Sequence, residues 1–362
     1  MQEKPTSLTK IALQRFKKST TGVLSFWYII LCGFIAIFCY AVAPDNSNNA
    51  NQMHLEIHSK PPGFTTQILT LPSESKEQSL VDFIIKGSTT KTSEVPISSY
   101  VISNDQLVVK LYSDYPSLQQ TKSYPIQNFN KNPIDSIKEK TFYLGTDKYG
   151  RDLLSRILIG TRISFFIGFI AVFISLVLGI TVGAIAGYYG GKVDNMVMWL
   201  INITWSIPTL LLVIAITLAL GKGFWQIFIA VGLTMWVEVA RIVRGQILST
   251  KQQQYVEAAK VLGFSDFRII FKHILPNIMA PIIVISAANF AAAILIESGL
   301  SFLGIGAQPP TPSWGAMIKD HYSYIIVGKA YLAVIPGLAI MSLVLAFMLI
   351  GNALRDALDV KN

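Results

Sequence analysis

Six stretches of the chain are apolar over about the length that a helix needs to cross a membrane. A bilayer core is roughly 30 Å thick, and roughly 20 helical residues span it. Each stretch is nearly free of charge, apart from Glu238, Arg241 and Arg244 near the end of the fourth and Glu297 near the end of the fifth. The pattern predicts an all-α integral membrane protein with six transmembrane helices, at residues 23–43, 163–189, 196–220, 224–244, 277–298 and 330–354.

The first stretch has a basic flank and ends in Ala41-Val42-Ala43, as a cleaved secretory signal does. Its apolar run, about 21 residues, is longer than a signal core of roughly 7–15. Pro44 also occupies the residue after the would-be cleavage point. We therefore expect an uncleaved transmembrane anchor at residues 22–43.

Basic residues are distributed unevenly along the chain, which has 30 Lys and Arg against 21 Asp and Glu, a formal charge of +9. Residues 44–160 carry as many basic as acidic side chains, so the excess lies in the apolar parts and argues against nucleic-acid binding. Most of it flanks the first span and the loop after the fourth, which the positive-inside rule places in the cytoplasm. Both termini are then cytoplasmic, and residues 44–145 are extracytoplasmic. The tail at 1–21 contributes Lys4, Lys10, Arg15, Lys17 and Lys18, and the outer loops carry Lys222, Lys319 and Lys329.

Within this tail, Leu8, Ile11, Ala12 and Phe16 recur at helical spacing. A short basic helix on the membrane interface fits this spacing. A disordered basic tail fits it equally well.

Residues 44–145 are richer in Pro, Ser, Thr, Asn and Lys and contain no long apolar run. Short segments at 83–85, 95–102 and 106–112 have β-type patterning between turn residues. We expect a small β-rich extracytoplasmic insert here, followed by a five-helix core at 146–362.

Small residues and prolines mark the predicted spans. Gly179, Gly183 and Gly187 form a ridge with a spacing of four, which permits close helix packing in lipid. Pro208 in the third span and Pro336 in the sixth each remove a backbone hydrogen bond and favour a kink.

The sequence lacks the motifs of nucleotide- or metal-dependent catalysis. Around Gly190-Gly191-Lys192 a phosphate-binding loop fails, because Ala186 and Val193 replace its first Gly and its Ser/Thr. His54 and His58 lie four residues apart, but without a nearby Cys a solvated pair is a better interpretation than a metal site. We therefore predict no metal or cofactor bound by this chain and no enzymatic activity of its own.

The loop at about 245–276 has the pattern of two short helices joined at a glycine. Thr250 to Gln253 is a capping box, and the helix that follows ends at Gly263. Ser265 is expected to cap the second helix, and Pro276 leads into the fifth span. The loop is expected to expose Phe264, Phe267, Ile270 and Phe271 among Arg268, Lys272 and His273. Such a surface suits docking of another protein; the alternative is an interfacial helix on lipid headgroups.

This loop resembles a known family. Glu257-Ala258-Ala259, Gly263 and Leu275-Pro276 match the loop of permease subunits of bacterial ATP-binding-cassette importers, although His273 stands where that pattern has Ile. The resemblance implies that the loop is the coupling helix, which sits in a cleft of an ATPase subunit.

Two further stretches look like the C-type permease subunit of dipeptide and oligopeptide importers, a group that includes nickel permeases. The first is Gly145-Thr146-Asp147-Lys148-Tyr149-Gly150-Arg151-Asp152, and the second is Leu300-Ser301-Phe302-Leu303-Gly304-Ile305-Gly306. The resemblance covers the first span and about residues 145–362, but it does not obviously cover 44–144.

The resemblance implies the type I importer permease fold in the bacterial plasma (inner) membrane. It also implies a second, paralogous permease subunit, two cytoplasmic ATPase subunits that use ATP and Mg, and an extracytoplasmic substrate-binding protein. The residues expected to act in coupling are Glu257, Ala258, Ala259, Gly263, Phe264, Phe267, Arg268, Leu275 and Pro276. Glu257 is expected to pair with a basic residue of the ATPase or of its own loop.

The segment after the fifth span, residues 301–318, is rich in Gly and Pro. We expect it to meet the binding protein or the substrate, or else to pack over the end of the bundle. The residues expected to form a translocation path or outer gate are Glu297, Ser301, Gly304, Gly306 and Trp314, with Glu297 chosen because ionisable residues in spans usually serve function. Glu238 is expected to pair with Arg241 or Arg244.

The expected function is half of an ATP-driven import pathway for peptides, with nickel or another small solute as the alternative. A stand-alone ion-driven transporter should usually show midplane charges and broken helices in matching halves. Here the charges fall near predicted span ends. A membrane-anchored sensor would need no coupling loop.

Overall fold

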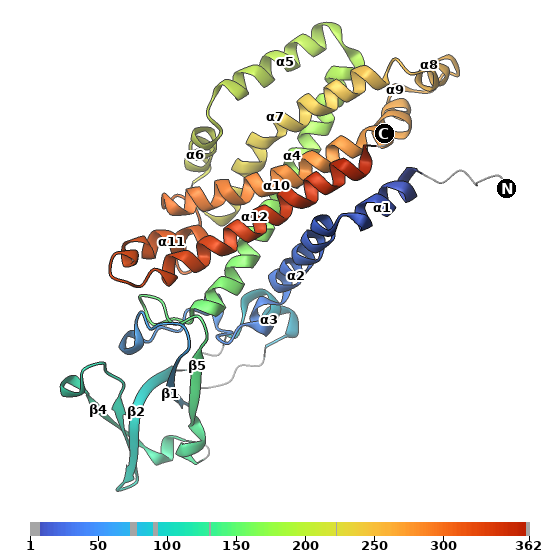
Figure 1. The fold of residues 1–362 in the computed structure, drawn as a ribbon. Coiled ribbons are helices and arrows are strands. Elements are labelled where there is room, and N and C mark those ends of the chain that lie inside the picture. The colour runs from blue at the N-terminus through green and yellow to red at the C-terminus, as the bar shows by residue number, and fades with distance from the viewer. Residues whose placement is uncertain (1–7, 73–77, 90–92, 130–131, 222, 360–362) are drawn as a thin grey trace, which may run out of the picture. The chain divides into compact units, whose positions relative to one another are not determined.

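The computed structural model describes residues 8–72, 78–89, 93–129, 132–221 and 223–359, so Lys4 and Lys222 lie outside the described residues. Within these ranges, five helices are long and apolar enough to cross a membrane, and a bent helix pair can make a sixth crossing. Five of the six predicted spans are thereby confirmed as single helices. The helices are α2 (Thr20–Val42), α4 (Leu153–Tyr189), α7 (Phe224–Thr250), α10 (Met279–Phe302) and α12 (Tyr331–Leu358), and the pair is α5 (Gly191–Ser206) with α6 (Thr209–Leu220) (Figure 1).

Two of these helices extend well beyond the apolar stretches that predicted them. α4 begins at Leu153 rather than at 163, and α7 ends at Thr250 rather than at 244. Hydropathy marks only the part suited to lipid, whereas backbone hydrogen bonding continues the helix further. The extension of α7 changes the place of Glu238 within its helix. At 1.5 Å per residue, about 21 Å of α7 precede Glu238 and about 18 Å follow it. Glu238 therefore lies near the middle of its helix and not in its last turns.

The prediction of one continuous span at 196–220 is wrong, because the helix breaks at Ile207 and Pro208. α5 and α6 meet there at 93°. Ile207 has a ψ of 127°, the extended conformation that a residue before proline prefers. Pro208 then serves as the N-cap of α6. The proline thus ends one helix and begins another, where the sequence predicted only a kink.

α4 packs against α7 through the predicted glycine ridge. A Cβ on Gly179 would lie 2.5 Å from the Val239 side chain, and one on Gly183 would lie 2.5 Å from the Ala240 carbonyl oxygen. A Cβ on Gly187 would come within 2.9 Å of the backbone of α7. The three glycines therefore allow close backbone contact over two turns, as predicted.

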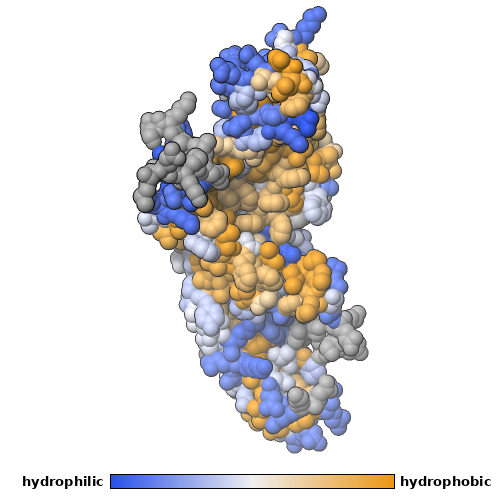
Figure 2. Space-filling model, turned by 90° about the vertical axis from the view of Figure 1, so that its right-hand side faces the viewer, coloured by the Kyte–Doolittle hydropathy of each residue, from blue (hydrophilic) through white to orange (hydrophobic). Residues whose placement is uncertain are grey.

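Large apolar side chains remain exposed on the long helices. They include Leu24, Trp27, Phe169, Phe173, Leu211 and Met341, each more than half exposed. Figure 2 shows broad hydrophobic areas on one face of the molecule. Exposed apolar surface on this scale is typical of helices that contact lipid or partner subunits.

The chain divides into two compact units, which are described separately. One contains Met1–Cys32, Ser164–Gln308 and Ile340–Asn362; the other contains Gly33–Ile163 and Pro309–Ala339. The second unit holds an antiparallel sheet of order β4-β3-β2-β1-β5. Its strands are β1 (Phe64–Leu71), β2 (Ser93–Ser103), β3 (Gln106–Leu111), β4 (Thr121–Pro125) and β5 (Ile137–Phe142) (Figure 1).

The sheet confirms the β-rich nature of the insert. β2 and β3 correspond to the predicted strands at 95–102 and 106–112 and pair with each other, with Tyr100 opposite Val109. The prediction of β structure at 83–85 is wrong, because these residues lie in α3 (Leu80–Lys86). Leu69, Ile97, Leu107, Val109 and Leu111 of the sheet form a buried core together with Phe129, which follows β4.

The predicted solvated pair of histidines is wrong for His54, which is buried. Its Nε2 lies 3.4 Å from a Glu94 carboxylate oxygen, and Lys140 Nζ lies 2.8 Å from the same oxygen. Burial would raise the pKa of Glu94, but the bonds from His54 and Lys140 outweigh it and lower that pKa to about 2.

The remaining elements are short. α1 (Leu8–Lys18) confirms the helical interpretation of the described part of the tail. The others are α8 (Gln254–Val261), α9 (Asp266–Arg268), α11 (Trp314–His321), and single turns at Asn48–Ala50, Leu55–Ile57, Pro116–Leu118, Ile126–Asn128, Pro133–Ser136 and Tyr322–Ile325.

Candidate functional site: the glycine-hinged loop and the C-terminal end of α10

The loop between α7 and α10 starts differently from its predicted form. Thr250 is the last residue of α7 and not a helix cap. α8 begins at Gln254, and its N-cap residue, Gln253, makes no side-chain capping bond. The capping-box prediction is therefore wrong, because the polar residues at 250–253 form the turn between two helices.

Gly263 ends α8 as predicted. Its φ is +74°, and its N–H donates to Lys260 O at 2.9 Å while the Phe264 N–H donates to Ala259 O at 3.2 Å. These two bonds make a Schellman motif, which satisfies carbonyl groups at a helix end and turns the chain. Gly263 is thus the hinge residue of the loop.

The segment after the hinge is continuous with the next span, contrary to the predicted separate short helix. α9 runs into a π-helical turn, η6 (Ile269–Ile274), and a 3₁₀ turn, η7 (Leu275–Ile278), which joins α10. Pro276 sits at the start of η7, where its missing N–H costs little. Ser265 is the N-cap residue of α9 but makes no side-chain capping bond, so its predicted capping role is wrong.

The loop is fixed to the end of α4 by polar contacts around one tyrosine. Tyr188 Oη donates to Asp266 Oδ1 at 2.7 Å, and Lys251 Nζ donates to the Tyr188 carbonyl at 2.5 Å. Beneath these bonds, apolar side chains of the loop join a buried cluster with α4 and α7: Val239, Val243, Ile247, Val256, Ala259, Ile269, Ile270 and Ile274. The hinge region is therefore an ordered knuckle rather than a free loop.

The exposed surface of this knuckle is apolar and basic. Phe267 is 71% exposed, and Phe271 is 49% exposed with its ring 4.4 Å from that of Phe267. Val261 and Leu262 are 88% and 71% exposed. The sequence reading missed these two, although their place at the end of a short helix before its glycine cap could have shown them. The prediction that Ile270 is exposed is wrong, because it packs in the buried cluster.

The other predicted coupling residues divide between surface and interior. Those exposed are Glu257, Ala258, Gly263, Arg268 and Pro276; those buried or half-buried are Ala259, Phe264 and Leu275. Phe264 stacks on His273 and lies under the Arg268 guanidinium, 4.7 Å from the ring centroid. Among the described residues Glu257 forms no ion pair, which leaves its carboxylate available to a partner.

The C-terminal end of α10 carries a second Schellman motif. Gly304 has a φ of +81°, its N–H donates to Ser301 O at 3.0 Å, and the Ile305 N–H donates to Leu300 O at 2.9 Å. Ser301 Oγ donates to Glu297 Oε1 at 2.7 Å and accepts from the Ala307 N–H at 3.1 Å. Glu297 is completely buried.

Close packing holds this turn together. A Cβ on Gly306 would lie 2.1 Å from Ser301 Oγ, so only glycine fits there. The structure thus brings Glu297, Ser301, Gly304 and Gly306 into one small cluster.

Trp314 belongs to the other unit and is buried there. Its Nε1 donates to Ile157 O at 3.0 Å, and its ring fills the space over Gly160. This geometry favours the packing role that was the alternative for the segment after α10. In the same unit, Asp147 of the first motif is fully buried and accepts hydrogen bonds from Tyr149 N, Arg151 N and Arg151 Nε at 2.8, 3.0 and 2.7 Å.

Glu238 does not pair as predicted. Arg244 forms a two-bond ion pair with Asp194, and Arg241 lies 3.5 Å over the centroid of the Trp205 ring and reaches Asn202 Oδ1 at 3.4 Å. Both arginines are therefore engaged by α5. Among the described residues Glu238 has no ion-pair partner, and its side chain is exposed.

Comparison with known proteins identifies the family. The model of the binding-protein-dependent transport system inner membrane component matches residues 179–361, half of the chain. This chain belongs to that family. A second model, the N-terminal TM domain of oligopeptide transport permease C, matches residues 7–62 of this permease. The predicted resemblance to importer permeases is thereby confirmed.

Individual relatives agree with the family. The permease is 39% identical over 244 residues to the glutathione transport system permease protein GsiD of Pectobacterium atrosepticum, covering 67% of this chain and 81% of that one. It is 43% identical over 219 residues to the dipeptide transport system permease protein DppC of Bacillus subtilis, covering 60% and 68%. An inward-facing MetNI methionine ABC transporter structure aligns with a TM-score of 0.46 at 19% identity, covering 56% of this chain and 96% of that chain.

The family, rather than the position of charges, decides against a stand-alone ion-driven transporter. One helix pair, α5–α6, is broken, but the structure shows no second broken pair among the described residues to match it. The permease is a multi-pass membrane component of an ATP-binding-cassette importer.

Proposed function

We propose that this permease imports peptides and forms half of the pathway, with a second, paralogous permease subunit forming the other half. Its relatives are named for dipeptide and glutathione transport, and glutathione is itself a tripeptide. Two ATPase subunits that use ATP and Mg supply the energy, and an extracytoplasmic binding protein delivers the peptide. Nickel or another small solute is the alternative within the same family, and among the described residues no His, Cys, Asp and Glu cluster could hold a metal ion.

The proposed orientation places both termini and the knuckle in the cytoplasm of a bacterium, with the protein in the inner membrane. The positive-inside rule supports this, because the tail and the knuckle carry most of the excess basic charge. The sheet then lies outside, where it is available to a binding protein.

The main support for this function is the exposed surface of the knuckle. Four exposed apolar side chains, Val261, Leu262, Phe267 and Phe271, project from a loop that the buried cluster and Tyr188 hold in place. An exposed apolar surface on a fixed scaffold is typical of a docking site. We assign it to the ATPase, with Glu257 pairing a basic residue of that subunit.

The cluster at the outer end of α10 is proposed as part of the gate. Ser301 joins the buried Glu297 to the loop through bonds to Glu297 Oε1 and from Ala307 N. Rearrangement of the loop would therefore change the environment of a carboxyl group beside the proposed pathway mouth.

Co-purification tests this function. Tagged permease should bring down ATPase subunits, and the reconstituted complex should hydrolyse ATP faster when loaded binding protein is added. Val261→Asp should abolish ATPase recovery, whereas Ile326→Asp, at an equally exposed apolar position (89%) outside the knuckle, should not. Absence of an ATPase from the wild-type complex would contradict the proposal.

A further inference from the structure

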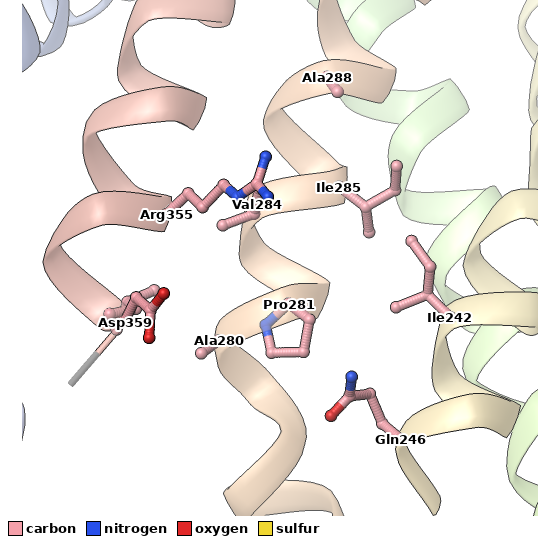
Figure 3. Close-up of a pocket in the computed structure, with 10 residues that line it drawn as sticks. Ile242, Gln246, Ala280, Pro281, Val284, Ile285, Ala288, Arg355 and Asp359 are labelled. Atoms are coloured by element: carbon pink, nitrogen blue, oxygen red, sulfur yellow. The ribbon is translucent and has the colours of Figure 1, made fainter. Parts of the chain in front are cut away.

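Two cavities lie on the same faces of α7 and α10. One, of about 570 Å³, is bordered by α7, α10 and α12; in Figure 3, Ile242 of α7 and Ile285 of α10 point toward one another across it. The second, of about 160 Å³, lies where the α5–α6 break meets α7 and α10.

The lining residues of both cavities follow helical periodicity. α7 contributes Thr234, Met235, Val237 and Glu238 to the smaller cavity and Ile242 and Gln246 to the larger one. α10 contributes Ala292 and Ile296 to the smaller cavity, and Ala280, Pro281, Val284, Ile285 and Ala288 to the larger one. On each helix, residues at spacings of three and four run along one side from one cavity to the other. The two cavities therefore lie along a single groove between α7 and α10.

The break between α5 and α6 indicates that this groove holds water. Non-helical backbone at membrane depth is tolerated where it is buried in protein or lines a water-filled cavity. Ile207, between the two helices, is 40% exposed and lines the smaller cavity. Because Ile207 is exposed and lines the cavity, a water-filled cavity fits this break better than burial in protein does.

Glu238 is the acidic side chain on the wall of the smaller cavity. It lies within the apolar stretch at 224–244, and an ionisable side chain within a membrane span is a functional-site candidate. Arg241, one turn away, is held against Trp205 and Asn202, and Arg244 is held by Asp194. The carboxylate therefore faces the groove without a cation among the described residues.

We propose that Glu238 binds the cationic ammonium group of the solute midway along this groove. The inference deepens the proposed function and rests on it for the solute class, since a peptide carries an ammonium group at its amino terminus. A carboxylate binds an ammonium group by a charge-assisted hydrogen bond, which a blocked amine cannot form. Glu238 would thus select for a free amino terminus inside the membrane.

A cysteine reporter tests whether the groove is wet and selective. Ile242→Cys places a thiol one turn from Glu238 on the same face, and the native Cys32 and Cys39 are both buried. We expect a charged methanethiosulfonate reagent to label this cysteine in the assembled complex. Dialanine should slow labelling at least about fivefold more than N-acetyl-dialanine does when Glu238 is present, and both should act equally in Glu238→Gln.

Uptake into proteoliposomes gives the second readout. Glu238→Gln should lower dialanine uptake about tenfold with assembly unchanged, and Glu238→Asp should retain more activity. Asp356→Asn, which removes an exposed carboxylate outside both cavities, is the matched control and should behave as wild type.

The outcomes separate this inference from the proposed function. Failure of the charged reagent to label Ile242→Cys, or unchanged amine selectivity in Glu238→Gln, would overturn the subsite. Loss of assembly in Glu238→Gln would show that the carboxylate serves the contact with the second permease and would overturn it as well. If the wild-type complex imports no dialanine but labelling remains amine-selective, the subsite stands and the peptide function is wrong.

Discussion

Replacing Gly263 tests coupling, because a side chain at this position would strain the backbone conformation without clashing with neighbouring atoms. Its φ is +74°, yet a Cβ at this position would meet nothing within 4 Å. A non-glycine residue in the left-handed region costs roughly 1–2 kcal/mol. A cost of that size lowers the population of the native turn roughly 5–30-fold relative to other loop conformations.

Gly263→Trp should leave membrane insertion intact but uncouple ATP hydrolysis from uptake. Once the turn is lost, the bonds from Gly263 N to Lys260 O and from Phe264 N to Ala259 O are lost with it, and the exposed surface is no longer held. Gly263→Asn should remain close to wild type, because asparagine tolerates the left-handed conformation. Gly245→Ala is the control, since Gly245 also has open space but lies within the helix α7.

The measurement is the number of substrate molecules imported per ATP hydrolysed in proteoliposomes, together with the yield of assembled complex. Gly263→Ala should lower coupling through backbone strain alone. Gly263→Trp should lower it through backbone strain and through the size of the added side chain. Wild-type substrate-stimulated ATPase and transport in Gly263→Trp would refute the assignment of the knuckle as the coupling element.

Three further predictions address other parts of the molecule. Glu297→Gln should impair transport without loss of assembly, because the buried carboxyl accepts the Ser301 hydroxyl at the proposed gate; unchanged uptake kinetics would remove Glu297 from the gate. Gly183→Val should destabilise the complex by about 1–3 kcal/mol through overpacking against α7, measured as a lower unfolding temperature in detergent, with Gly245→Val as the control at an open position. Glu94 has a folded pKa of about 2, below its ordinary 4.5, so its contribution to stability of about 3 kcal/mol is present above pH 4.5 and lost as the pH falls toward 2. Hydrogen exchange of β2, corrected for intrinsic rates, should show the first part of this loss between pH 4.5 and pH 3 and show little of it in Glu94→Gln.

The parts of the fold that depend on local periodicity could be predicted from the sequence. Five of the six spans follow from apolar length, the ridge at Gly179, Gly183 and Gly187 from a spacing of four, and the end of α8 from Gly263. Each of these signals lies within one turn or one segment of chain. The structure confirms them because contacts with distant segments do not change the local conformation at these positions.

Features that depend on neighbouring segments could not be predicted in this way. The apolar residues 83–85 suit a strand or a helix equally, and the structure resolves them as part of α3. Ile270 is buried because the chain continues into α10 instead of forming a free helix. Glu238 loses its expected partners because α5, distant in sequence, binds both arginines.

The continuity of the helical segment after the hinge changes how the two ends of α10 are related. A separate helix ending at Pro276 would absorb motion of the knuckle locally, whereas the helical segment from Asp266 to Phe302 runs for 37 residues, about 55 Å. A glycine with positive φ lies just outside each end, Gly263 before it and Gly304 after it. The sharp turns of the chain thus lie at the ends of a continuous segment, and displacement of the knuckle by an ATPase would move the Glu297–Ser301 cluster with it. A flexible insertion of two glycines after Pro276 should therefore weaken coupling even though it leaves the knuckle surface intact, and full coupling in that variant would refute transmission through α10.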